Sequence, residues 1–300
     1  MIHLHDVEAG YRAFRLAPAS VEFPSGSLTA LIGPNGCGKS TLLKVMSRQL
    51  WPIAGKITIG GKDAARLTPR ALARRLALLP QENLAPPGSK VAELVGYGRA
   101  PHQNFLGMQT EVDREHVARA MERLDLTELA EREVDTLSGG QRQRVFIAMA
   151  LAQDAPAMLF DEPTNWLDIQ HQVEVLRLMK GLAREGRSCV VVLHDIAQAA
   201  RYADRLVIMQ EGRIVAAGAP EEVLTAELVS HVYMLSVEIH PDPVTGTPVP
   251  VPLELGSLPQ GRRFCAGLVS SDCEFLKRPL LARSRLCHRH PRVRDDREIY

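Results

Sequence analysis

The sequence predicts an α/β protein built on a mostly parallel sheet. Short β-rich runs alternate along the chain with amphipathic stretches of helical length. The chain has 300 residues, of which 45% are hydrophobic and 24% charged, as is typical of a folded globular protein. Between about residues 85 and 155 helix candidates dominate and strand candidates are absent, which predicts a helical subdomain inserted into the α/β core.

The individual elements follow from hydrophobic periodicity and turn residues. The strand candidates are short apolar runs: Ser27–Ile32, Lys56–Ile59, Leu76–Leu79, Met158–Phe160, Cys189–Leu193 and Leu206–Met209. The glycine-containing pairs Gly60-Gly61 and Glu211-Gly212 are typical of hairpin turns and predict an antiparallel β edge. The helix candidates carry apolar residues at helical spacing: Lys39–Leu50, Pro69–Arg74, Val112–Leu124, Gly140–Gln153, Ile169–Glu185 and Ile196–Tyr202.

Charge and cysteine content exclude several classes of protein. The 36 basic and 35 acidic side chains nearly cancel, so no overall field attracts the protein to nucleic acid. The apolar runs are much shorter than the ~20 residues that a bilayer crossing requires. The five cysteines lack paired spacing, and the N-terminus has no signal-peptide pattern. We therefore expect an intracellular chain that neither binds nucleic acid nor crosses a membrane.

The last 45 residues differ from the rest of the chain. Residues 256–300 hold ten basic and five acidic side chains, together with three of the five cysteines. This stretch has no sustained periodicity and is interrupted by Pro259, Pro279 and Pro291. We interpret it as a basic, disordered tail outside the folded unit of residues 1–255. Just before the tail, five prolines between residues 241 and 252 require extended or turn backbone.

The strongest motif is a phosphate-binding loop. Residues 33–40 match the pattern G-x-x-x-x-G-K-[ST] in full, between an apolar strand and an amphipathic helix. Glycines let backbone N–H groups turn toward phosphate oxygens, and the start of the following helix attracts the same anion. Lys39 can neutralise the β- and γ-phosphates, and the Ser40 hydroxyl can ligate Mg²⁺. The predicted ATP-binding residues of this segment are Gly33, Pro34, Asn35, Gly36, Cys37, Gly38, Lys39, Ser40 and Thr41.

Polar residues follow three of the predicted strands. Asp161 and Glu162 end an apolar run, where a parallel sheet binds its ligands. Asp161 suits a Mg²⁺ contact, and Glu162 suits the general base that activates an attacking water. One βαβ crossover brings His194 to the same edge, where it can hydrogen-bond a γ-phosphate. Gln81 follows another strand and can reach Mg²⁺ or the water, although each of these residues also has a purely structural interpretation.

A second anion-binding segment lies far from the phosphate loop in sequence. Ser138, Gly139, Gly140 and Gln141 begin a long helix, yet the chain has one phosphate loop. The segment resembles the signature of ATP-binding cassette (ABC) ATPases, and the resemblance covers about residues 2–253. It implies a P-loop NTPase fold with a RecA-like core, residues 1–84 and 156–255, and a helical subdomain, residues 85–155. It also implies a head-to-tail homodimer in which the signature of one chain closes over ATP held by the other.

The resemblance assigns further roles by position. Tyr11 matches the aromatic residue that stacks on adenine, although a lone tyrosine is often structural. Gln81 matches the glutamine that joins the core to the helical subdomain and contributes to the Mg²⁺ site. Asp168 matches the aspartate that communicates across the dimer, and His194 matches the switch histidine. Lys39, Gln81, Glu162 and His194 are thus the expected catalytic residues.

The finer resemblance is to ATPase subunits that serve importers of ferric siderophores, haem or cobalamin. Its residues lie in four stretches, 98–103, 166–172, 197–202 and 241–248, and they look most like the ferric-siderophore branch. This implies a Mg²⁺-dependent ATPase on the cytoplasmic face of the cell membrane. Its partners would be a second copy of itself, integral permease subunits and, indirectly, a substrate-binding protein. The siderophore is not determined, and haem and cobalamin remain alternative cargoes.

Two other classes of function fit the sequence less well. A chromosome-type ABC ATPase carries a long coiled coil between the phosphate loop and the signature, but here 96 residues separate Ser40 from Leu137 without sustained heptads. Ribosome-type members usually carry two cassettes in one chain, and this chain has one. A stand-alone P-loop kinase would leave the signature segment unexplained.

Overall fold

The computed structural model describes residues 1–81, 83–103 and 107–253, so the predicted tail of residues 256–300 lies outside the described residues. The strands are β1 (Ile2–Tyr11), β2 (Phe14–Phe23), β3 (Ser27–Ile32), β4 (Ala54–Ile59), β5 (Lys62–Asp63), β6 (Leu76–Leu79), β7 (Ala157–Asp161), β8 (Ser188–Val192), β9 (Arg205–Gln210), β10 (Arg213–Gly218), β11 (Val237–Pro241) and β12 (Pro248–Pro252). The α-helices are α1 (Lys39–Met46), α2 (Pro69–Ala73), α3 (Val91–Tyr97), α4 (Glu111–Glu122), α5 (Gly139–Ala152), α6 (Ile169–Arg184), α7 (Ile196–Tyr202), α8 (Pro220–Val223) and α9 (Ala226–Tyr233).

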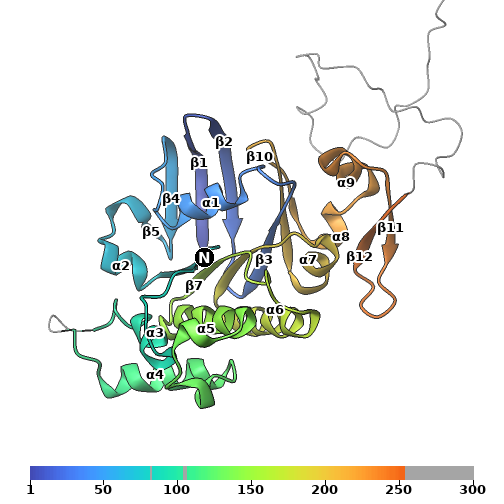
Figure 1. Ribbon diagram of the computed structural model, residues 1–300. Helices are drawn as coiled ribbons and strands as arrows, with labels where there is room; N and C mark the ends of the chain where they lie inside the picture. The colour runs from blue at the N-terminus through green and yellow to red at the C-terminus, as the bar shows by residue number, and fades with distance from the viewer. Residues whose placement is uncertain (82, 104–106, 254–300) are drawn as a thin grey trace, which may run out of the picture. The chain divides into compact units, whose positions relative to one another are not determined.

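The central feature is a six-stranded sheet in the order β10-β9-β3-β8-β7-β6. Its strands β3, β7 and β10 are labelled in Figure 1. Its strands β9, β3, β8, β7 and β6 run parallel, and β10 pairs antiparallel with β9. Every residue of β3, β7 and β8 is buried, which explains why these strands appear in the sequence as continuous apolar runs. The predicted α/β fold with a mostly parallel sheet is confirmed.

Each face of this sheet is covered by a different layer. Side chains of successive strand residues point to opposite faces, so Ala30 and Ile32 join one cluster while Leu31 joins the other. The first cluster contains the buried faces of α5, α6 and α7, and the second contains α1 and the antiparallel sheet β2-β1-β4-β5. The phosphate loop therefore connects β3, which contributes side chains to both clusters, to α1, which packs in the second cluster.

The helices α3, α4 and α5 lie between β6 and β7 in sequence and contact one another (Figure 1). A buried ion pair ties this group together, with Arg99 Nε 2.9 Å from Asp113 Oδ1 and Arg99 Nη1 donating to Ala152 O. Arg74, just after α2, donates from Nε to Pro101 O at 2.8 Å. The predicted helices of this region are present as α4 and α5, whereas α3 was not predicted. Within the described residues, no helix has the length and apolar character needed to cross a membrane.

The structure corrects one local prediction and adds the strands β1 and β2. The helix predicted over Lys39–Leu50 ends at Met46, because Arg48 adopts a left-handed conformation with φ +60°. The Arg48 guanidinium then donates to Ala64 O and Leu67 O, which holds the turn. The ten-residue strands β1 and β2 were not predicted, since a bulge at Asp6 interrupts the alternation of β1. Pro18 lies inside β2 and is tolerated because β2 is an edge strand.

The proline-rich segment near residue 250 forms the hairpin β11–β12. Pro248, Pro250 and Pro252 alternate along β12, so their nitrogens, which cannot donate hydrogen bonds, share the edge that points away from β11. The extended backbone predicted for this segment is confirmed. The hairpin contacts α7 and α9. Arg201 Nη1 of α7 lies 3.7 Å from Asp242 Oδ2.

Candidate nucleotide-binding site

The phosphate loop connects the buried end of β3 to the first turn of α1. Gly33, Gly36 and Gly38 have φ values of +148°, +77° and +108°, a region that favours glycine. A Cβ atom on Gly33 would lie 2.1 Å from the Met209 carbonyl oxygen, so β9 leaves no room for a side chain there. The loop conformation therefore depends both on the glycines and on the neighbouring strand.

Lys39 is the first residue of α1 and is buried, with 5% of its surface exposed. Its Nζ donates hydrogen bonds to Gly33 O at 2.8 Å and to Pro34 O at 3.1 Å. These bonds fold the ammonium group back over the loop, where it can meet an anion cradled by the same backbone. Cys37 is also buried, and burial raises the pKa of its thiol, as expected for a small filler residue rather than a nucleophile.

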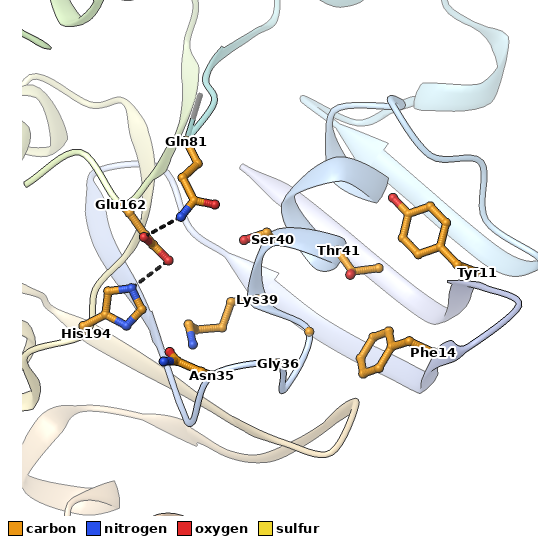
Figure 2. A pocket seen from close by; sticks show the side chains of 11 residues that line it. Tyr11, Phe14, Asn35, Gly36, Lys39, Ser40, Thr41, Gln81, Glu162 and His194 are labelled. Atoms are coloured by element: carbon orange, nitrogen blue, oxygen red, sulfur yellow. Dashed lines mark hydrogen bonds and ion pairs between the residues drawn. The ribbon is translucent and has the colours of Figure 1, made fainter. Parts of the chain in front are cut away.

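A cavity of about 630 Å³ opens over this loop (Figure 2). Tyr11, at the end of β1, and Phe14, at the start of β2, line one end of the cavity. Gln81, Glu162 and His194 line the other end. Asn35, Gly36, Gly38, Lys39, Ser40 and Thr41 line the part between these ends. The cavity thus brings an aromatic surface, an anion-binding loop and a carboxylate into one space.

The two carboxylates after β7 have different surroundings. Asp161 is buried, and Ser40 Oγ donates to its Oδ1 at 3.1 Å. Burial raises the pKa of Asp161, and the hydrogen bond from Ser40 partly opposes this rise. Glu162 is the next residue and adopts φ +53°, which turns its side chain from the sheet toward the cavity (Figure 2). Asp161 and Ser40 thus provide a pair of oxygen atoms that suits a cation. Glu162, in contrast, presents its carboxylate to the cavity.

The Glu162 carboxylate contacts side chains that follow the two neighbouring strands. His194 Nε2 lies 2.7 Å from Glu162 Oε1, and Gln81 Nε2 donates to Glu162 Oε2 at 2.8 Å. Gln81 follows β6 and His194 follows β8, the two neighbours of β7 in the sheet. Gln81 also lines a smaller cavity of about 240 Å³ with Ser40 and Asp161. The strand order therefore brings together the polar residues that the sequence places at separate strand ends.

The signature residues lie elsewhere. Ser138 is the N-cap of α5, where its Oγ accepts from Gln141 N–H and Gln141 Oε1 accepts from Ser138 N–H, a reciprocal capping box. Among the described residues that line the 630 Å³ cavity, none belongs to the segment 138–141. Asp168 is likewise separate: it caps α6 and accepts from the His171 backbone and ring, bonds that lower the pKa of its exposed carboxyl group.

Two residues of the site were missed by sequence reasoning. Phe14 lines the cavity beside Tyr11, and a Cβ atom on Gly38 would lie 2.7 Å from the Phe14 ring. Asn165 donates from Nδ2 to Glu162 Oε2 at 2.6 Å. Phe14 carries no motif, and its role depends on pairing between β1 and β2. Asn165 stands three residues after Glu162, a spacing that could have indicated a turn contact.

The fold and the site define a P-loop nucleotide-binding protein. The sequence profile described as ABC transporter matches residues 16–165. The ferric enterobactin transport ATP-binding protein of Escherichia coli is 49% identical over 81% of this chain and 91% of its own length. A probable siderophore transport ATP-binding protein of Bacillus subtilis is 45% identical over 78% and 85%. The chain belongs to the ABC transporter family, as an ATP-binding subunit with ATPase chemistry.

Solved structures of the family have the same fold. An inward-facing metal-chelate type ABC transporter matches with a TM-score of 0.74 and 28% identity, over 85% of this chain and 98% of the matched chain. A dimeric bacterial ABC transporter cassette matches with a TM-score of 0.67 and 27% identity, over 73% and 98%. These likenesses confirm the predicted P-loop NTPase architecture.

Proposed function

We propose that this chain is the ATP-hydrolysing subunit of an importer for ferric siderophore complexes. The observation that carries the proposal is the 49% identity to the ferric enterobactin transport subunit along 91% of that protein. A hemin import subunit of Nocardia farcinica, at 44% identity, and a cobalamin import subunit of Halobacterium salinarum, at 42%, keep haem and cobalamin as alternatives. The ATPase subunit does not need to contact the transported molecule, so the identity of the cargo is inferred from the sequence similarity to these relatives.

Growth assays identify the cargo. A strain lacking the gene is expected to lose growth on one class of ferric siderophore as sole iron source and to regain it with the wild-type gene. Unchanged growth on every siderophore, combined with lost growth on haem or lost use of cobalamin, would assign the cargo to the corresponding alternative. The Glu162→Gln chain should fail to restore growth, because it keeps the protein but removes the proposed base.

The nucleotide is proposed to lie along the cavity, with adenine at the Tyr11 end and the γ-phosphate at the His194 end. Tyr11 stacks on adenine, and its 53% exposure leaves the ring face free for this contact. Residues Gly33–Thr41 enclose the phosphates with backbone N–H groups, and Lys39 adds a positive charge next to the same loop. His194 lies at the far end, where it contacts the γ-phosphate.

The residues around Ser40 fit a magnesium ion. Ser40 Oγ and Asp161 Oδ1 are 3.1 Å apart, both are oxygen ligands of the kind that Mg²⁺ prefers, and Gln81 lines the same small cavity. When bound, Mg²⁺ supplies positive charge that stabilises the transferring phosphoryl group. Ser40 and Asp161 would hold the ion, and the Gln81 amide oxygen would complete the protein's share of the site.

Glu162 is proposed as the general base. Its carboxylate faces the cavity beside His194 and Gln81, at the end where an attacking water would meet the γ-phosphate. The Glu162→Gln chain is expected to bind ATP with unchanged affinity and to lose hydrolysis by about 10²-fold or more, because the amide cannot accept the proton. Nucleotide affinity and phosphate release measure the two effects. Hydrolysis within about twofold of the wild type would overturn this assignment.

The complete site is proposed to need two chains. Ser138–Gln141 form an anion-binding helix start that is not part of the cavity of their own chain. In a head-to-tail homodimer this segment would close over the γ-phosphate held by the partner, with Asp168 at the same interface. Integral permease subunits would bind the dimer at the cytoplasmic face of the membrane, and a substrate-binding protein would deliver cargo to them. Co-purification with a permease would separate this proposal from a non-transport role.

A further inference from the structure

The carboxylate of Glu162 is held by donors from three segments of the chain. His194 Nε2 lies 2.7 Å from Oε1, while Gln81 Nε2 and Asn165 Nδ2 donate to Oε2 at 2.8 Å and 2.6 Å. The Glu162 side chain is only 10% exposed, so these contacts, rather than bulk water, fix its orientation. Among the described contacts of this carboxylate, the bond from Asn165 is the shortest.

Asn165 differs from the other two donors in its connection to Glu162. Gln81 and His194 follow the neighbouring strands β6 and β8, so their contacts depend on how three strand ends lie relative to one another. Asn165 belongs to the same turn as Glu162, and its backbone N–H also donates to Glu162 O at 3.2 Å. Its contact therefore persists through any rearrangement that moves neighbouring segments but leaves this turn intact.

The chemistry of the amide agrees with a directing role. A carboxylate accepts hydrogen bonds and donates none when ionised, so the Asn165 amide must turn its NH₂ group toward Glu162. Glu162 adopts φ +53°, a conformation that costs a non-glycine residue free energy and that surrounding contacts must maintain. The backbone and side-chain bonds of Asn165 together close the turn that presents this carboxylate to the cavity.

We propose that Asn165 is a positioning residue for ATP hydrolysis. Its side chain holds the Glu162 carboxylate toward the attacking water when the contacts of Gln81 and His194 with that carboxylate break or re-form. This inference rests on the proposed role of Glu162 as the base. It assigns to Asn165 an effect on turnover rather than on nucleotide binding, because Asn165 does not line the cavity over the phosphate loop.

The test compares two substitutions with a matched control in the full-length protein. Asn165→Leu removes the donor and keeps a similar volume, whereas Asn165→Asp keeps the shape but places a second carboxylate against Oε2. The control is Gln198→Leu. Gln198 lines the same adjoining cavity of about 260 Å³ as Asn165, but its Nε2 donates to Gln172 Oε1 at 2.9 Å and not to Glu162.

Asn165→Leu is expected to lower kcat about tenfold, equivalent to ~1.4 kcal/mol of transition-state stabilisation. Asn165→Asp is expected to lower kcat at least as far, since like charges repel at this distance. ATP affinity and the thermal unfolding midpoint should remain near wild type in both, and Gln198→Leu should hydrolyse ATP normally.

The order of the kcat values of the two Asn165 variants distinguishes a positioning role from a role in packing alone. A residue that only fills space would tolerate the isosteric Asn165→Asp better than Asn165→Leu, so that order would overturn the proposal. A wild-type kcat in Asn165→Leu would do the same. If Glu162→Gln still hydrolyses ATP, the proposed base is wrong. If Glu162→Gln is inactive and both Asn165 variants are normal, only the positioning role is wrong.

Discussion

At the scale of single residues, the phosphate loop combines backbone strain with close packing. Gly33 has φ +148°, and its α-carbon faces the carbonyl oxygen of Met209. Gly61, in the hairpin between β4 and β5, also has a left-handed φ of +72° but has nothing within 4 Å of an added Cβ. Replacing each glycine by alanine therefore distinguishes two free-energy costs. At Gly61 the new methyl group brings only backbone strain, whereas at Gly33 it brings strain and a steric clash with Met209.

We predict that Gly33→Ala lowers the free energy of unfolding by about 3 kcal/mol or more and impairs ATP binding, because strain and collision act together. Gly61→Ala should cost only about 1 kcal/mol and leave ATP binding unchanged, since the new methyl group meets open space. Chemical denaturation and nucleotide titration measure both effects. Equal stability losses in the two variants would show that contact with Met209 has no energetic weight.

At the scale of elements, the buried pair Arg99–Asp113 joins the segment after α3 to the start of α4. Their side chains are 5% and 3% exposed. Burial alone would raise the pKa of Asp113, but hydrogen bonds from Thr110 and Arg99 outweigh it and lower the pKa to about 2. The carboxylate is therefore ionised throughout the physiological range, and its charge is compensated by the Thr110 hydrogen bonds and the Arg99 guanidinium.

Arg99→Met is predicted to destabilise the protein by about 3 kcal/mol, because it leaves Asp113 charged and buried without its partner. The double variant Arg99→Met/Asp113→Leu should recover part of this loss, since it also removes the stranded charge. Urea unfolding of the wild type, Arg99→Met, Asp113→Leu and the double variant measures the coupling. Simple addition of two independent losses would contradict the pairing.

The same pair has a defined pH dependence. The pKa of Asp113 is lower in the folded protein than its ordinary value of 3.8, so its stabilising contribution is complete above pH 3.8. The contribution disappears as the pH falls from 3.8 toward about 2, where the folded-state carboxyl group takes up its proton. Over this window the wild type should lose more stability than Arg99→Met/Asp113→Leu.

At the scale of the whole molecule, the cavity and the signature segment are separate parts of one chain. Lys39 binds its own phosphate loop, and Ser138 caps α5 outside that cavity. If each catalytic site takes its phosphate loop from one copy and its signature segment from the other, two inactive variants should restore activity to each other in a mixed dimer. One variant would carry a substitution in the loop and the other a substitution in the signature segment.

We predict that Lys39→Ala and Ser138→Asp chains are each inactive alone and regain ATP hydrolysis when mixed. Aspartate preserves the helix cap of α5 but opposes the partner's phosphates, so stability should stay within about 1 kcal/mol of wild type. A heterodimer has one intact site, formed by the unaltered loop of one chain and the unaltered signature of the other. Phosphate release from the mixture is the measurement, and no recovery at any mixing ratio would argue against shared sites.

Local sequence accounts for the parts of the site that a few adjacent residues determine. Glycine spacing predicts the phosphate loop, because left-handed backbone at Gly36 and Gly38 is a local property. The apolar runs predict the parallel strands, because both faces of those strands are buried. A bulge and an edge-strand proline conceal β1 and β2, since their pattern makes sense only once their partners are known.

The sequence by itself therefore determined the class of fold, the anion-binding loop and the carboxylates at the end of β7. Only the tertiary structure decided which residues surround Glu162, because the order β8-β7-β6 sets His194 and Gln81 on either side of it. It also decided that Phe14 lines the cavity and that the signature segment does not. The physical reason is that backbone preferences act within a few residues, whereas side chains distant in sequence meet only where sheet order and packing bring them together.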